Sequence, residues 1–502
     1  MQGPSAGLAT VVGPPPGLRV QGHGFLGVEG RAGDPTHSRV LRSFVLAAVG
    51  ILLLYGVAGS LGTSEGRAMA NATLPAAMGL LCLGCAAALV RTSSLMVLMP
   101  TPWFLVTSAA YFGLGPLLFV FGPPGTIEDA NIFWPVTEES LFRTNVLNAA
   151  CIVTVVTVYW VSGRSGLLRS VGRLLRMAAL PEQQWLKVFL VVGVAVKYLL
   201  YLPYAFGVLT FIPASSFMVF GGLSSVALLM LSRRVFSGQW RFLPLFMVVA
   251  GLELAGGLLT FSKLEALLVV IFIGVGAYLA RPTRTLAVGF CLVAGSAYLV
   301  LIPLVNYGRR SVGPSAGASD RGQAFVNYTF GGPAVVPAQD EDIAGWWSRL
   351  SYPPVQTFVM DAYDSGAGGT SLQKIPMSLI PRFLWPSKPI VTIGDELTIL
   401  INRNAGSMSS PTSFGEGYWN GGWLGALGVA VWMGLVFRFF QTICLGQLAR
   451  GNFGVLPFAA MGTLMGLRAD DWFGPTYVGG FAIALAVYAS CLTFARALHG
   501  NR

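Results

Sequence analysis

The chain has 502 residues, of which 54% are hydrophobic and only 11% are charged. Soluble domains carry about 25% charged residues, so this composition excludes a water-soluble globular protein. The net charge of +11 does not indicate a nucleic-acid partner, because most of the excess lies in short connections between apolar runs, where membrane topology places arginine and lysine. Repeated apolar runs of roughly 18 to 25 residues predict an all-α, polytopic integral membrane protein in a lipid bilayer.

In chain order, residues 1–38 are rich in Gly and Pro, which predicts a disordered cytoplasmic tail. About twelve transmembrane helices follow, nine within 39–305 and three within 421–496, and residues 497–502 form a short cytoplasmic C-terminal tail. The expected spans are 43–61, 73–90, 103–121, 146–162, 185–208, 216–231, 242–261, 264–280, 285–305, 422–442, 453–467 and 477–495.

The short connections between these spans alternate in charge. With the N-terminus inside, an outer connection holds the acidic residues Glu128, Asp129, Glu138 and Glu139. The short inner connections are rich in arginine, at positions 91, 164, 169, 173, 176, 233, 234, 241, 281, 284 and 450. This distribution predicts that both termini are cytoplasmic. The polar insert 306–420 is then a large extracytoplasmic loop carrying short helices, and we interpret it as the catalytic loop. Cytosolic nucleotides do not reach that face, so a reaction there needs a donor that is already activated.

Cysteine and histidine give little support for metal chemistry. The Cys82–Cys85 pair has the spacing of a redox or zinc pair, but it lies in the middle of a span without a second pair, so we interpret it as small residues of a helix interface. All three histidines, His23, His37 and His499, lie in the tails. We therefore expect no metal site and no other cofactor.

Two spans carry ionisable residues, Lys197 in the fifth and Glu253 in the seventh. A charge in the middle of a bilayer costs about 2.5 kcal/mol or more, so such groups usually face a cavity or one another. One interpretation is a proton or ion path, and the other is a structural pair or the wall of a main cavity. Lys263 and Glu265 lie at the end of a span, where long side chains reach toward the headgroups.

The insert holds several cations with aromatic neighbours. Arg309 and Arg310 follow the ninth span directly and are candidate ligands of a phosphate or diphosphate, or else interfacial anchors. Arg382 and Lys388 lie among prolines that stiffen the segment, and Trp385 between them is placed to stack on a sugar ring or to rest on lipid.

Near the end of the insert, Glu416 lies between glycines, close to Tyr418. This carboxylate is a candidate general base for an acceptor hydroxyl, with the glycines allowing a bulky substrate to approach. The alternative is an acidic residue at a helix N-terminus. Arg468, in the last outer connection, is either a further phosphate ligand or a member of surface ion pairs with Asp470 and Asp471.

Two motifs of the insert, Pro-Arg-Phe-Leu-Trp-Pro-Ser-Lys-Pro at 381–389 and Ser-Phe-Gly-Glu-Gly-Tyr-Trp-Asn-Gly-Gly-Trp-Leu-Gly at 413–425, resemble those of the O-antigen and oligosaccharide repeat-unit polymerases of bacterial surface polysaccharide pathways. The number of spans and the late, large outer loop agree with this resemblance. It implies a metal-independent, inverting glycosyltransferase of the bacterial inner (cytoplasmic) membrane that polymerises polyprenyl-diphosphate-linked oligosaccharides into an O-antigen, capsule or exopolysaccharide.

The resemblance also implies site residues and partners. Arginines in outer loops are the functional residues of this family, and Arg309, Arg310, Arg382 and Arg468 match that description, with Lys388 beside them. The implied partners are the lipid-linked oligosaccharide, a chain-length regulator (polysaccharide co-polymerase) and a flippase. Two alternatives remain open. One is a ligase that transfers the finished glycan, and the other is a transporter or flippase of the lipid-linked unit.

Overall fold

The computed structural model describes residues 35–131, 134–178, 180–209, 219–312, 317–331, 345–380 and 410–500, with Trp385, Gly394, Leu397 and Leu400. Within these residues, eleven helices are long and apolar enough to cross a membrane, and the shorter apolar helix 453–467 accompanies them. These twelve segments coincide with the twelve expected spans. The prediction of an all-α, multi-pass membrane protein is therefore confirmed.

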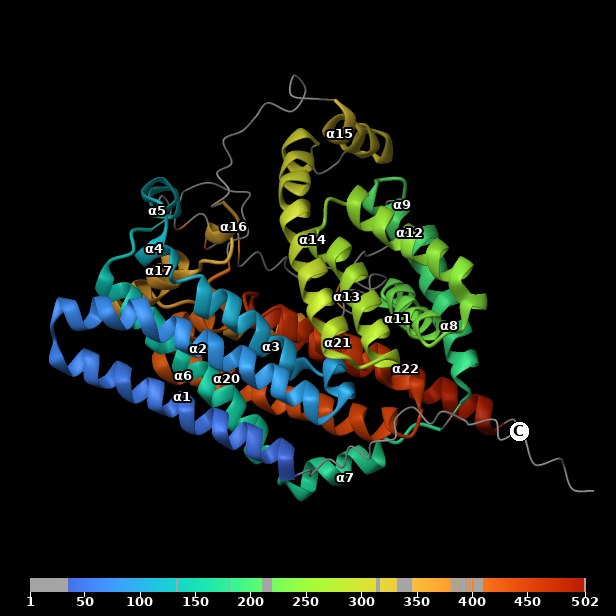
Figure 1. Cartoon of the computed structure of the whole chain (residues 1–502), viewed down its shortest axis with the longest axis horizontal. Helices are drawn as coiled ribbons and strands as arrows, with labels where there is room; N and C mark the ends of the chain where they lie inside the picture. Colours follow the sequence, from blue (N-terminus) through green and yellow to red (C-terminus); the bar gives the residue numbers. More distant parts are fainter. Residues whose placement is uncertain are drawn as a thin grey trace, which may run out of the picture.

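The transmembrane helices form two bundles (Figure 1). The first contains α1 (Pro35–Leu61), α2 (Ser64–Thr92), α3 (Pro100–Ser108), α6 (Glu138–Ser162) and α20 (Thr412–Leu448). The second contains α8 (Glu182–Val194), α11 (Leu223–Phe236), α12 (Leu243–Leu259), α13 (Lys263–Ala280) and α14 (Arg284–Ser311). Between them lie α21 (Leu456–Leu467), which contacts α3 as well as α11, and α22 (Gly480–Gly500).

Shorter elements complete the spans and connections. Three segments are π-helical: η2 (Ala109–Leu114), η3 (Ala195–Tyr201) and η7 (Gly474–Gly479). The short α-helices outside the insert are α4 (Leu118–Phe121), α5 (Pro124–Asn131), α7 (Gly166–Leu174) and α9 (Leu202–Ala205). The 3-10 turns are η1 (Ser94–Leu98), η4 (Trp240–Phe242), η5 (Leu372–Lys374) and η6 (Phe453–Val455).

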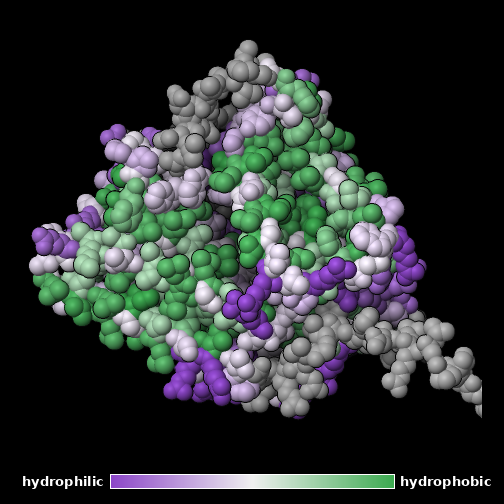
Figure 2. Space-filling model, in the orientation of Figure 1, coloured by the Kyte–Doolittle hydropathy of each residue, from purple (hydrophilic) through white to green (hydrophobic). Residues whose placement is uncertain are grey.

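Large apolar side chains cover the outside of the bundles. Leu53, Leu199 and Leu292 are 67%, 69% and 67% exposed, and Figure 2 shows a broad hydrophobic surface with hydrophilic residues gathered toward its edges. Such a surface is costly in water and favourable in lipid. The cysteines Cys82 and Cys85 are free and buried in α2, where they pack between helices as the sequence predicted.

The described part of the insert contains α15 (Ala318–Phe330), α16 (Gly345–Ser348), α17 (Pro353–Asp364) and α18 (Ile375–Leu379). Helix α17 packs against α6 and α20, and a buried amide network fixes it there. In this network the Gln356 amide nitrogen donates to Asn148 Oδ1 and to Thr412 Oγ1, at 2.9 Å each. The 306–420 boundaries differ from the helix ends, because α14 continues to Ser311 and α20 already begins at Thr412.

Helix α20 consists of two helical segments joined at a break. The break is formed by Gly421 (φ −162°, ψ 22°) and Gly422 (φ 57°, ψ −145°), the second of which has a conformation that L-residues rarely adopt. After the break the chain passes close to the first segment, since a Cβ added to Gly425 would lie 2.2 Å from the carbonyl oxygen of Gly417. The close approach leaves no room for a side chain at Gly417, where an added Cβ would lie 2.8 Å from Ala426 Cα.

Candidate functional site

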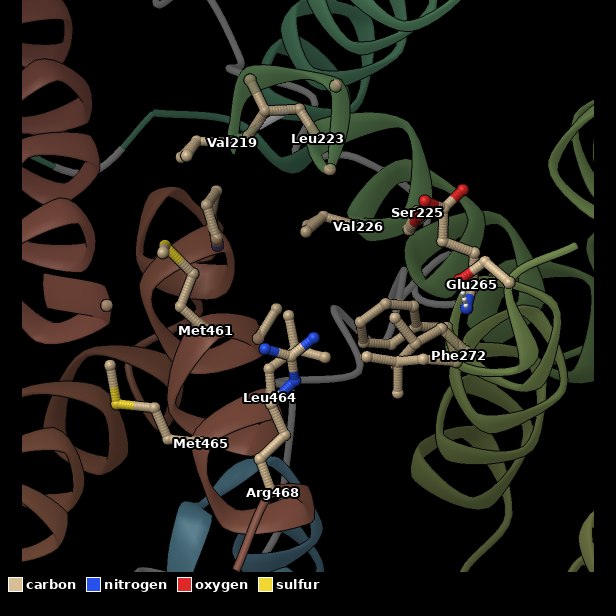
Figure 3. Close-up of a pocket in the computed structure, with 18 of the residues that line it drawn as sticks. Val219, Leu223, Ser225, Val226, Glu265, Phe272, Met461, Leu464, Met465 and Arg468 are labelled. Carbon is tan, nitrogen blue, oxygen red and sulfur yellow. Dashed lines mark hydrogen bonds between the residues drawn. The ribbon is translucent and has the colours of Figure 1, made fainter. Parts of the chain in front are cut away.

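A cavity of about 720 Å³ lies between the second bundle and the helices α21 and α22 (Figure 3). One wall comes from η3, α11 and α13, and the opposite wall comes from α21, η7 and α22. Most of its surface is apolar, with Val226, Leu268, Phe272, Met461 and Leu464 among the lining residues. A pocket of this size between transmembrane helices can hold a lipid chain or a comparable apolar ligand.

The polar end of the cavity is built from three helix ends. Lys263 begins α13, Arg309 lies in the last turn of α14, and Arg468 directly follows α21, and all three line the cavity. A cation at the C-terminal end of a helix is favoured by the helix dipole, which suits Arg309 and Arg468. The insert starts immediately after α14, so this polar end is on the insert's side of the helical bundles.

Arg309 and Arg468 are both exposed, and each is oriented by one contact. Arg309 Nε donates to the carbonyl oxygen of Phe261 at 3.2 Å, which ties α14 to the turn before α13. Arg468 pairs with Asp471 at 3.1 Å, and both side chains are partly exposed. The nitrogens that remain can bind an anion by the forked geometry that arginine offers to phosphate. Arg468 can therefore form its ion pair with Asp471 and bind a phosphate at the same time.

The cavity wall is irregular on both sides. Lys197 and Tyr201 come from the π-helical segment η3, and Pro475 and Thr476 come from the π-helical segment η7. In a π-helix the i→i+5 hydrogen bonds bulge the backbone, a feature frequent at functional sites.

Lys197 and Glu253 form the buried pair that the second interpretation of the sequence predicted. Lys197 Nζ lies 3.0 Å from Glu253 Oε2, and Lys197 also lines the cavity. Glu253 accepts three further hydrogen bonds, from the hydroxyls of Tyr198, Ser224 and Ser225. The carboxylate is thus saturated with donors, as a charge inside a membrane protein must be.

Glu416 lies in the first segment of α20, is fully buried and does not line the cavity. Its two oxygens are both engaged: Oε1 accepts from Ser371 Oγ of the insert at 2.7 Å, and Oε2 accepts from the backbone N–H of Phe473 at 2.6 Å. Asn420 completes this contact by donating to Ser371 Oγ at 2.8 Å. In this arrangement Glu416 joins three parts of the chain, namely α20, the insert and the connection before η7, and its role as a general base stays a prediction.

The connection 468–473, which carries Arg468, is fixed by further contacts. Tyr352 of the insert donates its hydroxyl to Asp470 Oδ2 at 2.7 Å, and Ser413 Oγ donates to the carbonyl oxygen of Asp471 at 2.7 Å. Burial raises the pKa of the Asp470 carboxyl to about 6, with the neighbouring Asp471 adding to the rise and the Tyr352 hydrogen bond opposing it. Arg468 therefore projects from a connection held by the insert and by α20.

Tyr418 belongs to a second cluster, away from the cavity lining. Its hydroxyl donates to Asp364 Oδ1 at 3.0 Å, and Arg143 of α6 pairs with Asp361 at 3.3 Å and also with Asp364. These ion pairs are partly exposed, and they attach α17 to α6.

The predicted site residues thus separate into groups. Arg309 and Arg468 line the cavity together, whereas Glu416 and Tyr418 lie elsewhere. Trp385 is half-buried. Arg382, Lys388 and the side chain of Arg310 lie outside the described residues, as do residues 1–34 of the predicted tail. The sequence had offered Asp471 as a possible cavity residue together with Arg468, but it did not single out Glu265, which lies in the first turn of α13 beside Lys263.

Comparisons of the chain with protein-family models, with curated proteins and with solved structures found no match.

Proposed function

We propose that the protein is a membrane glycosyltransferase that uses a polyprenyl-diphosphate-linked oligosaccharide as donor and joins such units into a polysaccharide. The observation that carries this proposal is the cavity, which combines a long apolar lining with cations at one end. The resemblance of the two insert motifs to repeat-unit polymerases points to the same chemistry.

The lining matches the parts of such a donor. The polyprenyl chain would lie along the apolar walls, beside residues such as Phe272 and Met461. The diphosphate would be held by Arg309, Arg468 and Lys263 at the polar end. Charge that develops on the departing diphosphate is stabilised there by fixed cations, so the reaction needs no protonation of a leaving oxygen.

The side of the membrane is consistent with this donor. The cavity's polar end is on the insert's side of the bundles, and the arginine distribution favours the extracytoplasmic face for that side. We propose a bacterial cytoplasmic membrane with both termini inside. A lipid-linked donor carries its activation with it, so it can react where nucleotide sugars are absent.

The proposal is tested with purified protein in liposomes and a polyprenyl-diphosphate-linked repeat unit. We expect a ladder of oligomers. Arg468→Ala should weaken donor binding about 10- to 100-fold, since a hydrogen bond between charged groups contributes about 1.5–3 kcal/mol. Arg281→Ala is the matched control, because this exposed arginine is not a cavity residue, and binding should stay within about twofold.

Two results would contradict the proposal. A lipid that crosses between leaflets without oligomer formation would identify a carrier, which is the alternative from a different class. Transfer of a finished glycan to a separate acceptor, without a ladder, would identify a ligase.

A further inference from the structure

Two carboxylates line the described part of the cavity, Asp471 and Glu265. Asp471 is fully engaged. Its Oδ2 accepts from Arg468 at 3.1 Å and from Thr476 Oγ1 at 2.7 Å, and its Oδ1 accepts from the N–H of Trp472 at 2.8 Å. An acceptor of this kind has little capacity left for a ligand.

Glu265 differs from Asp471. Its Oε1 accepts from the Tyr201 hydroxyl at 3.4 Å, while its Oε2 is buried and has no hydrogen-bond partner among the described residues. The Thr260 hydroxyl, in the turn before α13, donates to the carbonyls of Gly256 and Gly257 and also interacts with the Glu265 carboxylate. Glu265 as a residue is only partly buried and lines the cavity, so its carboxylate can be reached by a hydroxyl of a ligand in the cavity.

The position of Glu265 is fixed by the start of its helix. Ser262 is the N-cap of α13 and its side chain accepts from the Glu265 N–H at 3.3 Å, which holds the first turn in place. Figure 3 shows Glu265 and Arg468 on opposite walls of the same hollow. A donor diphosphate at Arg468 and an acceptor hydroxyl at Glu265 would thus share one cavity.

The other buried carboxylates do not offer this arrangement. Glu253 is saturated by Lys197 and three hydroxyls. Glu416 is buried away from the cavity, with both oxygens engaged.

We propose that Glu265 is the base that receives the proton of the acceptor hydroxyl, a role that rests on the glycosyl transfer proposed above. The acceptor oxygen forms a bond to the donor's anomeric carbon, and the bond from that carbon to the diphosphate oxygen breaks. The electron pair of the broken bond leaves with the polyprenyl diphosphate, beside Arg309 and Arg468. The hydroxyl proton moves to the Glu265 carboxylate and is afterwards lost to water.

The test compares donor binding with turnover in Glu265→Gln. Positioned proton transfer contributes about 10²- to 10⁴-fold to a rate, so we expect kcat to fall at least about 100-fold. The Kd of the donor should stay within about threefold, because Gln keeps the size of the side chain. Adding formate to Glu265→Ala should restore part of the turnover, which a structural role of Glu265 would not allow.

Each outcome decides the matter. Turnover of Glu265→Gln above about a hundredth of wild type, where a base contributes about 10² or more, would overturn the assignment of Glu265 while leaving the proposed function intact. Equal losses of binding and turnover, or no rescue by formate, would also overturn it. A wild-type protein that makes no ladder would overturn both proposals.

If Glu265→Gln does not fold, Glu265→Asp serves the same purpose. The shorter side chain retracts the carboxylate by one methylene group, so we expect a tenfold or greater fall in kcat, within the range of about 10²–10⁴ for the complete loss of a base, with donor binding retained. Unchanged turnover in this variant would overturn the assignment.

Discussion

Glu416 has two possible roles that predict opposite results in mutants. It either acts as a buried structural residue that joins Ser371 to Phe473, or it acts as a catalytic base. Glu416→Ala removes both acceptors and leaves Ser371 Oγ–H and the Phe473 N–H without partners. Hydrogen bonds to a charged group contribute about 1.5–3 kcal/mol each, so two of them amount to about 3–6 kcal/mol. The 502-residue chain has an unfolding entropy near 1 kcal/mol/K at about 2.1 cal/mol/K per residue, and we expect Tm to fall by about 3–6 °C.

Glu416→Gln separates the two roles. The Gln carbonyl can still accept from the Phe473 N–H, and its amide can donate to Ser371 Oγ, which leaves only the Ser371 proton without its acceptor. We expect a loss of about 1 kcal/mol and turnover close to wild type. In Glu416→Ala the connection 468–473 is loosened, so the KM for the donor should rise about tenfold, which corresponds to about 1.4 kcal/mol.

The assay is thermal unfolding in detergent together with oligomer formation in liposomes. A Glu416→Gln variant with normal Tm and abolished transfer would contradict the purely structural role of Glu416 and support its role as a catalytic base. A Glu416→Ala variant with unchanged Tm would refute the magnitude derived from the two hydrogen bonds.

Three further predictions concern stability and are each read from thermal unfolding in detergent. Lys197→Ala leaves the Glu253 carboxylate buried without its cation and should cost about 3–5 kcal/mol; a loss below about 1 kcal/mol would contradict the pair's burial. Gly422→Ala should cost about 1–3 kcal/mol for its backbone strain, more if the added Cβ, 2.7 Å from the Tyr363 ring, cannot be accommodated. Gly421→Ala is its control, because no atom lies within 4 Å of the added Cβ. Equal losses of stability in the two variants would contradict the strain expected at Gly422. Burial raises the pKa of Asp470 to about 6 in the folded protein. The fold is therefore most stable at a pH below the ordinary pKa of an aspartate, and it loses stability as the pH rises through about 6 and Asp470 ionises. The Tm of the wild type minus that of Asp470→Asn should fall as the pH rises through about 6, and a difference that does not change with pH would contradict this prediction.

The spans could be predicted from the sequence because each is a local property of composition. The Lys197–Glu253 contact was also within reach, since two charges in the middle of spans must either find one another or face a cavity. Arg309 and Arg468 were found as candidates because each lies at the end of a span, next to the predicted membrane surface, where arginine can bind a phosphate.

The contacts of Glu416 could not be predicted from the sequence in the same way. A glycine-rich stretch indicates an irregular loop, but here the glycines allow two helical segments to pack closely, and the carboxylate is enclosed between Ser371 and Phe473. Glu265 was interpreted as a side chain reaching toward the headgroups. Its place on the cavity wall depends on α13 lying opposite α21, which comes nearly two hundred positions later in the chain, and no local pattern reports such an arrangement.

The central claim is that the cavity between the second bundle and α21 and α22 holds a lipid diphosphate, and photocrosslinking tests it most directly. Leu464 is replaced by p-benzoylphenylalanine on the cavity wall, and Leu424, which is 84% exposed on α20 and not a cavity residue, is replaced in the control. With a polyprenyl-diphosphate-linked oligosaccharide, we expect labelling at 464 that Arg468→Ala strongly reduces, and only weak labelling at 424. Equal labelling at the two positions, or labelling at 464 that is indifferent to Arg468, would contradict the claim.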